Sequence, residues 1–125
     1  MRDGINMFFA DTYALVEIVK GNKHYMKYLF GNLITTKFNL AEFYYYLLRM
    51  HGEMKATEYL NIYEKLTIEI SKNSIIAGMR LKLKRKKENL SYADCIGYAT
   101  AREKGIKFLT GDEKFKNKPN VEFLK

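Results

Sequence analysis

Four acidic residues, spread along a chain of 125 residues, have side chains that could do chemistry: Asp11, Glu42, Asp94 and Asp112. Carboxylates that are brought together repel one another and resist desolvation, and a bound Mg²⁺ or Mn²⁺ reverses the sign of that interaction. If the fold gathers these residues, the chemistry that they favour is therefore binding of a divalent metal.

Each of these acids also has a plain structural role open to it. Asp11 can cap a helix that starts at the next residue. Glu42 follows Asn39 by three positions and Asp94 follows Ser91 by three, which is the spacing of a helix capping box. The fourth acid stands in a Gly-Asp sequence that is common in turns. Capping and metal binding are compatible, because a carboxylate at a helix start can still face a metal.

Other polar side chains predict little chemistry. We expect His24 and His51 on surface helices or turns, and Cys95 packed as a small hydrophobic residue. A single cysteine cannot form an internal disulfide and excludes a cysteine-rich zinc site. The sequence has no Ser/His/Asp or Cys/His arrangement, no Walker-type loop and no GxGxxG.

Short apolar runs alternate with longer stretches of helical periodicity along the chain. The predicted strands are residues 5–10, 33–36, 67–70, 106–110 and, at an edge, 121–124. The predicted helices are residues 12–20, 23–30, 40–50, 53–66, 72–87 and a last one from Ser91 that Gly105 terminates.

This alternation predicts an α/β fold in one domain, 1–125, with a parallel sheet of four or five strands and helices on both faces. In such sheets, ligands bind beyond the carboxyl ends of the strands. Asp11 and Asp112 come just after two predicted strands, and Glu42 and Asp94 lie in the first turns of two predicted helices. We therefore expect the four acids at one edge of the sheet.

The net charge of +8, with a pI near 9.5, favours polyanionic partners such as nucleic acid, although excess lysine can also serve solubility alone. A basic run at the end of the 72–87 helix is either a solvated helix end or a patch that follows RNA phosphates. The candidate RNA-binding residues in it are Lys82, Lys84, Arg85, Lys86 and Lys87. The first apolar stretch is too short for a signal peptide or a transmembrane helix, so we expect a cytoplasmic protein.

Three segments together make the chain resemble the PIN-domain family, in particular the VapC-type toxin ribonucleases of VapBC toxin–antitoxin systems. They are FADTYAL with Asp11, NLAEFYYYLLR with Glu42, and LSYADCIGYATAREKGIKFLTGDEKF with Asp94 and Asp112. The resemblance covers almost the whole chain, and its last segment is the most specific.

The resemblance implies a three-layer α/β/α sandwich. It also implies that the four acids bind Mg²⁺ or Mn²⁺, and that Thr110 helps by hydrogen bonding near the metal. The expected activity is cleavage of RNA phosphodiester bonds by a metal-activated water, in an endoribonuclease that is the toxin of a toxin–antitoxin pair. The expected partners are an RNA substrate, a cognate antitoxin and a second copy of the chain in a homodimer.

Other functions remain open at this point. A phosphotransferase of the haloacid dehalogenase type needs a second aspartate two residues after the first, where this chain has Tyr13. A receiver domain needs an acidic pair near the first strand, which the chain lacks. The nearer alternatives are a PIN-fold nuclease of RNA processing without an antitoxin, and a non-catalytic PIN-like module that binds RNA or protein.

Overall fold

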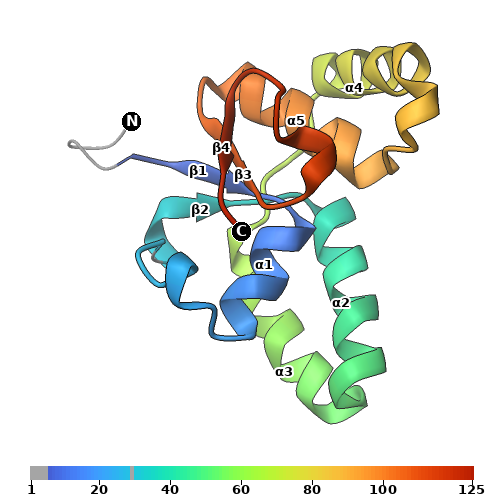
Figure 1. Ribbon diagram of the computed structural model, residues 1–125. Helices are drawn as coiled ribbons and strands as arrows, with labels where there is room; N and C mark the ends of the chain where they lie inside the picture. Colours follow the sequence, from blue (N-terminus) through green and yellow to red (C-terminus); the bar gives the residue numbers. More distant parts are fainter. Residues whose placement is uncertain (1–5, 29) are drawn as a thin grey trace.

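A parallel sheet forms the centre of the protein in the computed structural model, which describes residues 6–28 and 30–125 (Figure 1). Its strands are β1 (Phe8–Ala10), β2 (Leu33–Ile34), β3 (Lys107–Thr110) and β4 (Val121–Phe123). All pair in parallel, in the order β2-β1-β3-β4. The first strand therefore lies inside the sheet, between two strands that come later in the chain. The predicted start of this strand at Ile5 lies outside the described residues.

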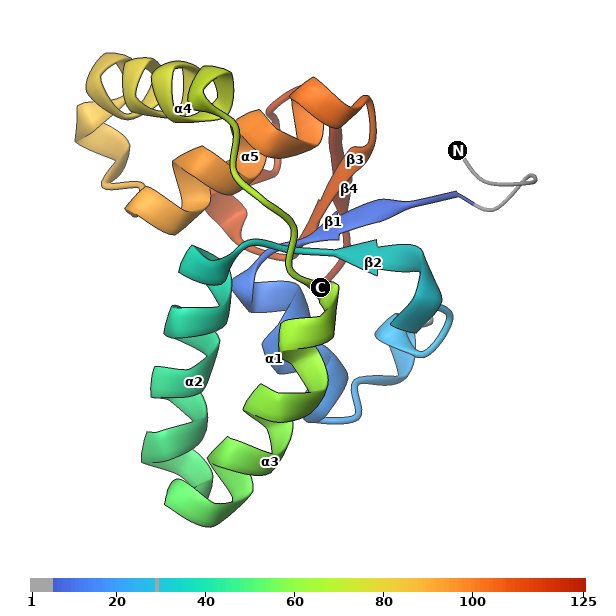
Figure 2. The same cartoon turned by 180° about the vertical axis from the view of Figure 1, so that it is seen from behind.

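Helices cover both faces of the sheet (Figures 1 and 2). On one face lie α1 (Thr12–Val19), α2 (Lys37–His51) and α3 (Glu53–Tyr63), and on the other lie α4 (Lys72–Lys84) and α5 (Tyr92–Lys104). The predicted three-layer α/β/α sandwich is confirmed. In the described part of the chain, no helix is both long enough and apolar enough to cross a membrane.

Two apolar clusters bury the two faces of the sheet. Phe9 and Phe108 point to the α5 face, where their rings stack with centroids 5.6 Å apart. Ala10 and Leu109, the next residues along each strand, belong to the cluster on the other face. Successive side chains of a strand point to opposite faces, so continuous apolar runs are what a sheet covered on both sides requires.

Strand register fixes which residues meet at the carboxyl edge. Ala10 pairs with Leu109, and the Asp11 N–H donates to the Leu109 carbonyl over 3.3 Å. Thr110 pairs with Phe123 in the neighbouring strand. The chain positions just after β1 and β3 are therefore side by side, although about a hundred residues separate them.

The predicted strand over residues 67–70 is wrong. Only Thr67 forms a bridge, to Thr35 beyond the end of β2. The Thr67 N–H and hydroxyl both donate to the Glu64 carbonyl and close a 3₁₀ turn (Glu64–Leu66) before the bridge. Pairing cannot continue after the bridge, because Thr36, the residue after Thr35, is the N-cap of α2. The β-branched residues that suggested a strand instead belong to the segment that connects the 3₁₀ turn to α4.

Several helix bounds also differ from the prediction. The helix expected over residues 23–30 is replaced by two 3₁₀ turns, Lys23–Tyr25 and Phe30–Asn32. The helix expected over 72–87 ends at Lys84, after which the backbone passes through a 3₁₀ turn, Lys86–Glu88. Short 3₁₀ turns are common where the α-helical hydrogen bonding pattern ends.

Candidate active site

Asp11 follows β1 directly and caps α1, since its Oδ1 atom accepts the Ala14 N–H over 2.8 Å. The residue is only 2% exposed. Burial raises the pKa of Asp11 to about 8, and the like charges of Asp94 and Asp112 act in the same direction. Hydrogen bonds from Thr110 and Ala14 oppose this rise in the pKa. The carboxyl group therefore lies buried beside other acids, a state that a cation would relieve.

Asp94 forms the predicted capping box at the start of α5. The Ser91 N–H donates to Asp94 Oδ2 over 2.9 Å, and the Asp94 N–H donates to Ser91 Oγ over 3.0 Å. Burial raises the pKa of Asp94, and the charges of Glu42 and Asp112 raise it further. These interactions, with those of Asp11, place all four acids in one electrostatic neighbourhood.

Glu42 does not belong to a capping box, contrary to one of the alternatives above. The helix α2 begins at Lys37, and its cap is Thr36, whose Oγ1 atom accepts the Asn39 N–H over 3.3 Å. Glu42 therefore lies in the second turn. Its Oε1 atom accepts the Thr12 hydroxyl over 2.7 Å, so a residue of α1 holds it in place.

A chain of buried and partly buried hydrogen bonds leads to Glu42. The Thr36 hydroxyl donates to Asn39 Oδ1 over 2.7 Å, and Asn39 Nδ2 donates to Thr12 Oγ1 over 3.3 Å. Sequence reasoning did not assign Thr12 or Asn39 to the site. Their signal is weak, because a threonine after an aspartate and an asparagine near a helix start both have ordinary capping roles.

Asp112 lies after β3 in a tight Thr110-Gly111-Asp112 turn. The Asp112 N–H donates to Thr110 Oγ1 over 3.0 Å, and its Oδ1 atom accepts the Lys114 N–H over 3.0 Å. A Cβ at Gly111 would lie 2.3 Å from the Tyr13 ring and 2.4 Å from the Leu124 carbonyl oxygen. Only glycine allows the turn to approach this closely.

The residues present fit a divalent cation in their chemistry. Carboxylate oxygens are hard ligands of the kind that Mg²⁺ and Mn²⁺ prefer. In the part of the chain that the structure describes, no three His, Cys, Asp or Glu side chains already surround a common metal position. Each of the four carboxylates instead accepts a hydrogen bond from its own surroundings.

Of the candidate RNA-binding residues, Lys82 is the one that lines a hollow together with one of the four site acids. It lines a hollow of about 460 Å³ together with Glu42, and its Nζ atom donates to the Leu90 carbonyl over 2.5 Å. The remaining members of the basic run are exposed: Lys84, Arg85, Lys86 and Lys87. Arg85 contacts Glu88 at 3.6 Å.

The expected structural roles of the histidines and the cysteine are confirmed. His24 and His51 are exposed. Cys95 is buried, and burial raises the pKa of its thiol to about 11, so it is not a thiolate nucleophile near neutral pH.

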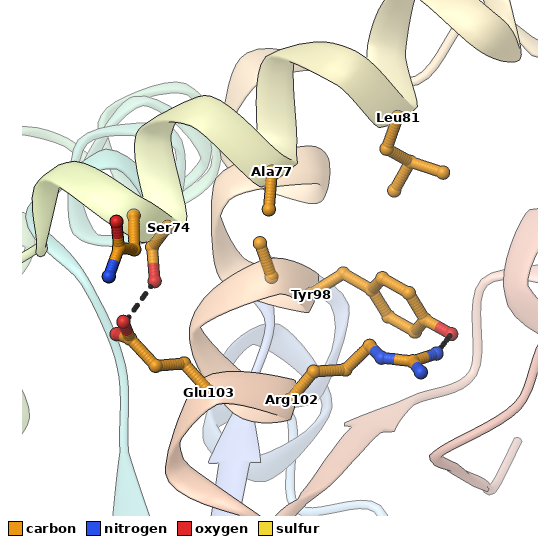
Figure 3. A pocket seen from close by; sticks show the side chains of 8 residues that line it. Ser74, Ala77, Leu81, Tyr98, Arg102 and Glu103 are labelled. Atoms are coloured by element: carbon orange, nitrogen blue, oxygen red, sulfur yellow. Dashed lines mark hydrogen bonds between the residues drawn. The ribbon is translucent and has the colours of Figure 1, made fainter.

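A second hollow, also of about 460 Å³, lies between α4 and α5 (Figure 3). Ala77 and Leu81 of α4 face Tyr98 of α5 across it. At one end, Glu103 accepts a hydrogen bond from Ser74, and at the other, Arg102 donates to the Tyr98 hydroxyl. None of the four acids lines this hollow.

The PIN domain family model matches residues 8–121, a range that contains all four acids. The chain belongs to the PIN-domain family. It matches no curated protein in sequence. The resemblance inferred from the three sequence segments is thus confirmed at the level of the family.

Solved structures with the same fold include toxins of toxin–antitoxin systems. Mycobacterium tuberculosis VapC20, described as a sarcin-ricin loop cleaving toxin, is 19% identical, with a TM-score of 0.74 over 94% of this PIN-domain chain and 99% of that chain. The DNA-bound VapBC complex from Salmonella typhimurium is 16% identical, with a TM-score of 0.73 over 95% and 97%. A toxin–antitoxin complex from Klebsiella pneumoniae is 20% identical, with a TM-score of 0.68 over 94% and 96%.

Proposed function

We propose that this PIN-domain protein is a Mg²⁺- or Mn²⁺-dependent endoribonuclease and the toxin of a toxin–antitoxin pair. The observation that carries the proposal is the electrostatics of the carboxyl edge. There, burial and neighbouring carboxylates raise the pKa values of Asp11 and Asp94. A protein with a net charge of +8 keeps these acids together although their repulsion destabilises the fold.

In this proposal the metal ligands are Asp11, Glu42, Asp94 and Asp112. A divalent cation held by them would lower the pKa of a water molecule and stabilise negative charge on the phosphoryl oxygens. Thr110 contributes through its hydroxyl, which hydrogen-bonds Asp11 and accepts the N–H of Asp112. The Thr110 hydroxyl is thus hydrogen-bonded to two of the proposed ligand residues.

The protein's own residues also prepare the reaction geometry. The Thr12 hydroxyl engages Glu42 Oε1, which leaves Oε2 for the cation or for a proton from the attacking water. The carboxylates of Asp11, Asp94 and Asp112 each accept a backbone N–H, and these hydrogen bonds hold them in place before substrate arrives. Such preorganisation reduces the reorganisation needed during the reaction.

The proposed partners are an RNA substrate, a cognate antitoxin and a second copy of this chain, within a single-domain cytoplasmic protein. The positive net charge supports RNA. The structural relatives described as VapBC or toxin–antitoxin complexes support an antitoxin. Exposed apolar side chains on α3 and α4 support contacts with protein: Met54, Ile62, Ile75, Ile76 and Leu83.

The test is incubation of purified protein with labelled RNA and Mn²⁺, alongside an EDTA control and the Asp94→Asn variant. We expect cleavage only by the parent chain with metal. Equal cleavage in all three samples would contradict the four-acid site. Binding of RNA without cleavage would favour the non-catalytic module, and cleavage by a chain that no antitoxin inhibits would favour an RNA-processing nuclease.

A further inference from the structure

A groove continues from the acidic edge toward α4. It is the hollow of about 460 Å³ described above, and its lining includes Phe38 and Glu42 of α2, Lys82 of α4 and Tyr92 of α5. Phe38 and Glu42 are four residues apart and share one side of their helix. Tyr92 is the first residue of α5, two positions before Asp94. The groove therefore opens beside the proposed metal ligands.

Two aromatic rings are exposed in this groove. Phe38 is 45% exposed and Tyr92 is 60% exposed. Exposed rings beside a charged groove are typical platforms for unpaired nucleobases, because every base can stack on an aromatic face. A ligand with flat apolar faces would cover both rings.

A cation accompanies the Tyr92 ring. The Lys82 Nζ atom lies 4.8 Å from the centroid of that ring and is held by the Leu90 carbonyl. Lys82 and Tyr92 also line an adjoining hollow of about 340 Å³, which Lys86 joins. Positive charge next to an exposed aromatic ring is the combination typical of proteins that bind single-stranded nucleic acid.

The exposed rings together with the charges favour RNA over an acidic peptide, because each nucleotide carries a flat base beside its phosphate. Glu42 stands at the acidic end, where the proposed cation would attract a phosphate. Lys82 and Lys86 continue the path away from the acids. A polynucleotide can bind along the whole groove, with one phosphate at the proposed metal and others at the lysines.

We infer that Phe38, Lys82 and Tyr92 form a subsite for an unpaired base of the RNA beside the scissile phosphate. Tyr92 stacks on the base, Lys82 contacts a flanking phosphate, and Phe38 forms the apolar wall on the α2 side. The inference rests on the proposed ribonuclease function. It deepens that function by requiring the RNA to be single-stranded, or looped out, where it is cut.

The experiment measures binding to two fluorescein-labelled probes by anisotropy. One is octauridylate, and the other is an octamer with the same phosphates and abasic sugars. All chains carry Asp94→Asn and are titrated with Mn²⁺ present, so that the RNA is not cut. We expect Tyr92→Leu to weaken octauridylate binding about tenfold and to leave the abasic octamer unchanged, since one stacked base is lost.

Two controls accompany this measurement. Tyr92→Phe keeps the ring and should retain the affinity. Tyr45→Leu removes another exposed tyrosine, 64% exposed and with Arg49 at 5.2 Å from its ring centroid, which does not line the groove. It should also leave binding unchanged. Thermal melting of each variant checks that the fold is intact.

Unchanged octauridylate binding by Tyr92→Leu would overturn the subsite, as would equal losses with both probes. Loss of a protein partner with unchanged RNA binding would assign the groove to protein and overturn it as well. If the unmodified chain still cleaves RNA with Mn²⁺ in those cases, the ribonuclease function stands. If that chain neither binds nor cleaves any RNA, both proposals fail.

Discussion

The two hollows of about 460 Å³ have similar sizes, but the acids in or next to them differ in their electrostatic surroundings. Between α4 and α5, the Glu103 carboxylate accepts hydrogen bonds from Ser71 at 2.7 Å and Ser74 at 3.0 Å (Figure 3 shows the second). These bonds lower the pKa of Glu103. Beside Glu42, in contrast, burial and like charges raise the pKa of Asp94.

The difference teaches that volume does not identify the functional site in this protein. The α4–α5 hollow holds an acid whose charge is already satisfied by neighbouring hydroxyls. The acidic edge holds carboxylates whose charges oppose one another, so it gains most from a cation. Buried acids with raised pKa values are concentrated at functional sites in folded proteins.

The largest expected effect is on the rate of RNA cleavage, and it should distinguish Asp94 from Glu103. Asp94→Asn keeps an oxygen for the Ser91 N–H but removes a proposed charged metal ligand, so the initial rate of RNA cleavage should fall by more than about 100-fold. Glu103→Gln is the matched control and should leave the rate within about twofold, as expected of a surface side chain far from the chemistry. Equal losses in the two variants would remove the distinction between the hollows.

Metal removal should make the acidic edge sensitive to pH. The folded-state pKa of Asp11 is about 8, against an ordinary value of 3.8, so the folded protein binds more protons than the unfolded chain between these values. We therefore expect the stability of the metal-free protein to fall as pH rises from 5 to 8, by about 2 kcal/mol or more, since each pKa unit corresponds to about 1.4 kcal/mol. Denaturant titrations in EDTA measure this loss.

Two comparisons check the origin of that pH dependence. Asp11→Asn cannot ionise and should show a flatter profile in EDTA. Added Mn²⁺ should restore the stability of the parent chain at pH 8, because binding to the folded state alone stabilises it. A parent profile as flat as that of the variant would mean that Asp11 is not the titrating group.

Gly111→Ala should destabilise the Thr110-Gly111-Asp112 turn through a steric clash. The added Cβ would lie 2.4 Å from the Leu124 carbonyl oxygen, a backbone atom with little freedom to move. We expect a loss of about 1 to 3 kcal/mol in the free energy of unfolding, together with slower cleavage as Asp112 shifts. Gly31→Ala is the control, since a Cβ there meets nothing within 4 Å.

Thr12→Val tests the hydrogen bonds that position Glu42. The substitution keeps the shape of the side chain and removes the hydroxyl that links Asn39 to Glu42. We expect kcat to fall about tenfold, the size of effect typical of groups that orient metal ligands, with KM little changed. Thr12→Ser should recover most of the rate, and a KM effect alone would argue for a role in RNA binding.

The smallest effect concerns the α4–α5 hollow. Ser71→Ala removes the cap of α4 and one hydrogen bond to Glu103, so thermal or chemical unfolding should show a loss of about 1 kcal/mol. RNA cleavage should not change. A loss of activity at temperatures where the variant stays folded would link this hollow to the reaction after all.

Local signals explain what could be predicted from the sequence. Asp11 and Asp112 follow short apolar runs that are typical of buried strands, and the spacing of Ser91 and Asp94 defines a capping box that the structure contains. The same spacing misled at Asn39 and Glu42, because Thr36 starts the helix three residues earlier. A capping motif specifies the spacing of two residues. It does not specify which of two nearby polar residues, here Thr36 and Asn39, caps the helix.

Side-chain contacts between helices that are distant in the sequence could not be predicted. The bond from Thr12 to Glu42 joins residues 30 positions apart, and the groove between Phe38, Lys82 and Tyr92 needs three helices in place. Residues 67–70 have the composition of a strand, yet pairing stops after one bridge because the partner segment enters α2 at Thr36. Tertiary geometry decides in each case, because local preferences are compatible with more than one outcome.

The strand order has a consequence for synthesis on the ribosome. The strand β1 leaves the ribosome early, but one of its two neighbours, β3, begins only at Lys107. A nascent chain that stops short of β3 has no partner for one side of β1 and has not yet made Asp112. Under the proposed function, an incomplete chain therefore cannot cut RNA, and activity begins only when translation of this domain is nearly finished.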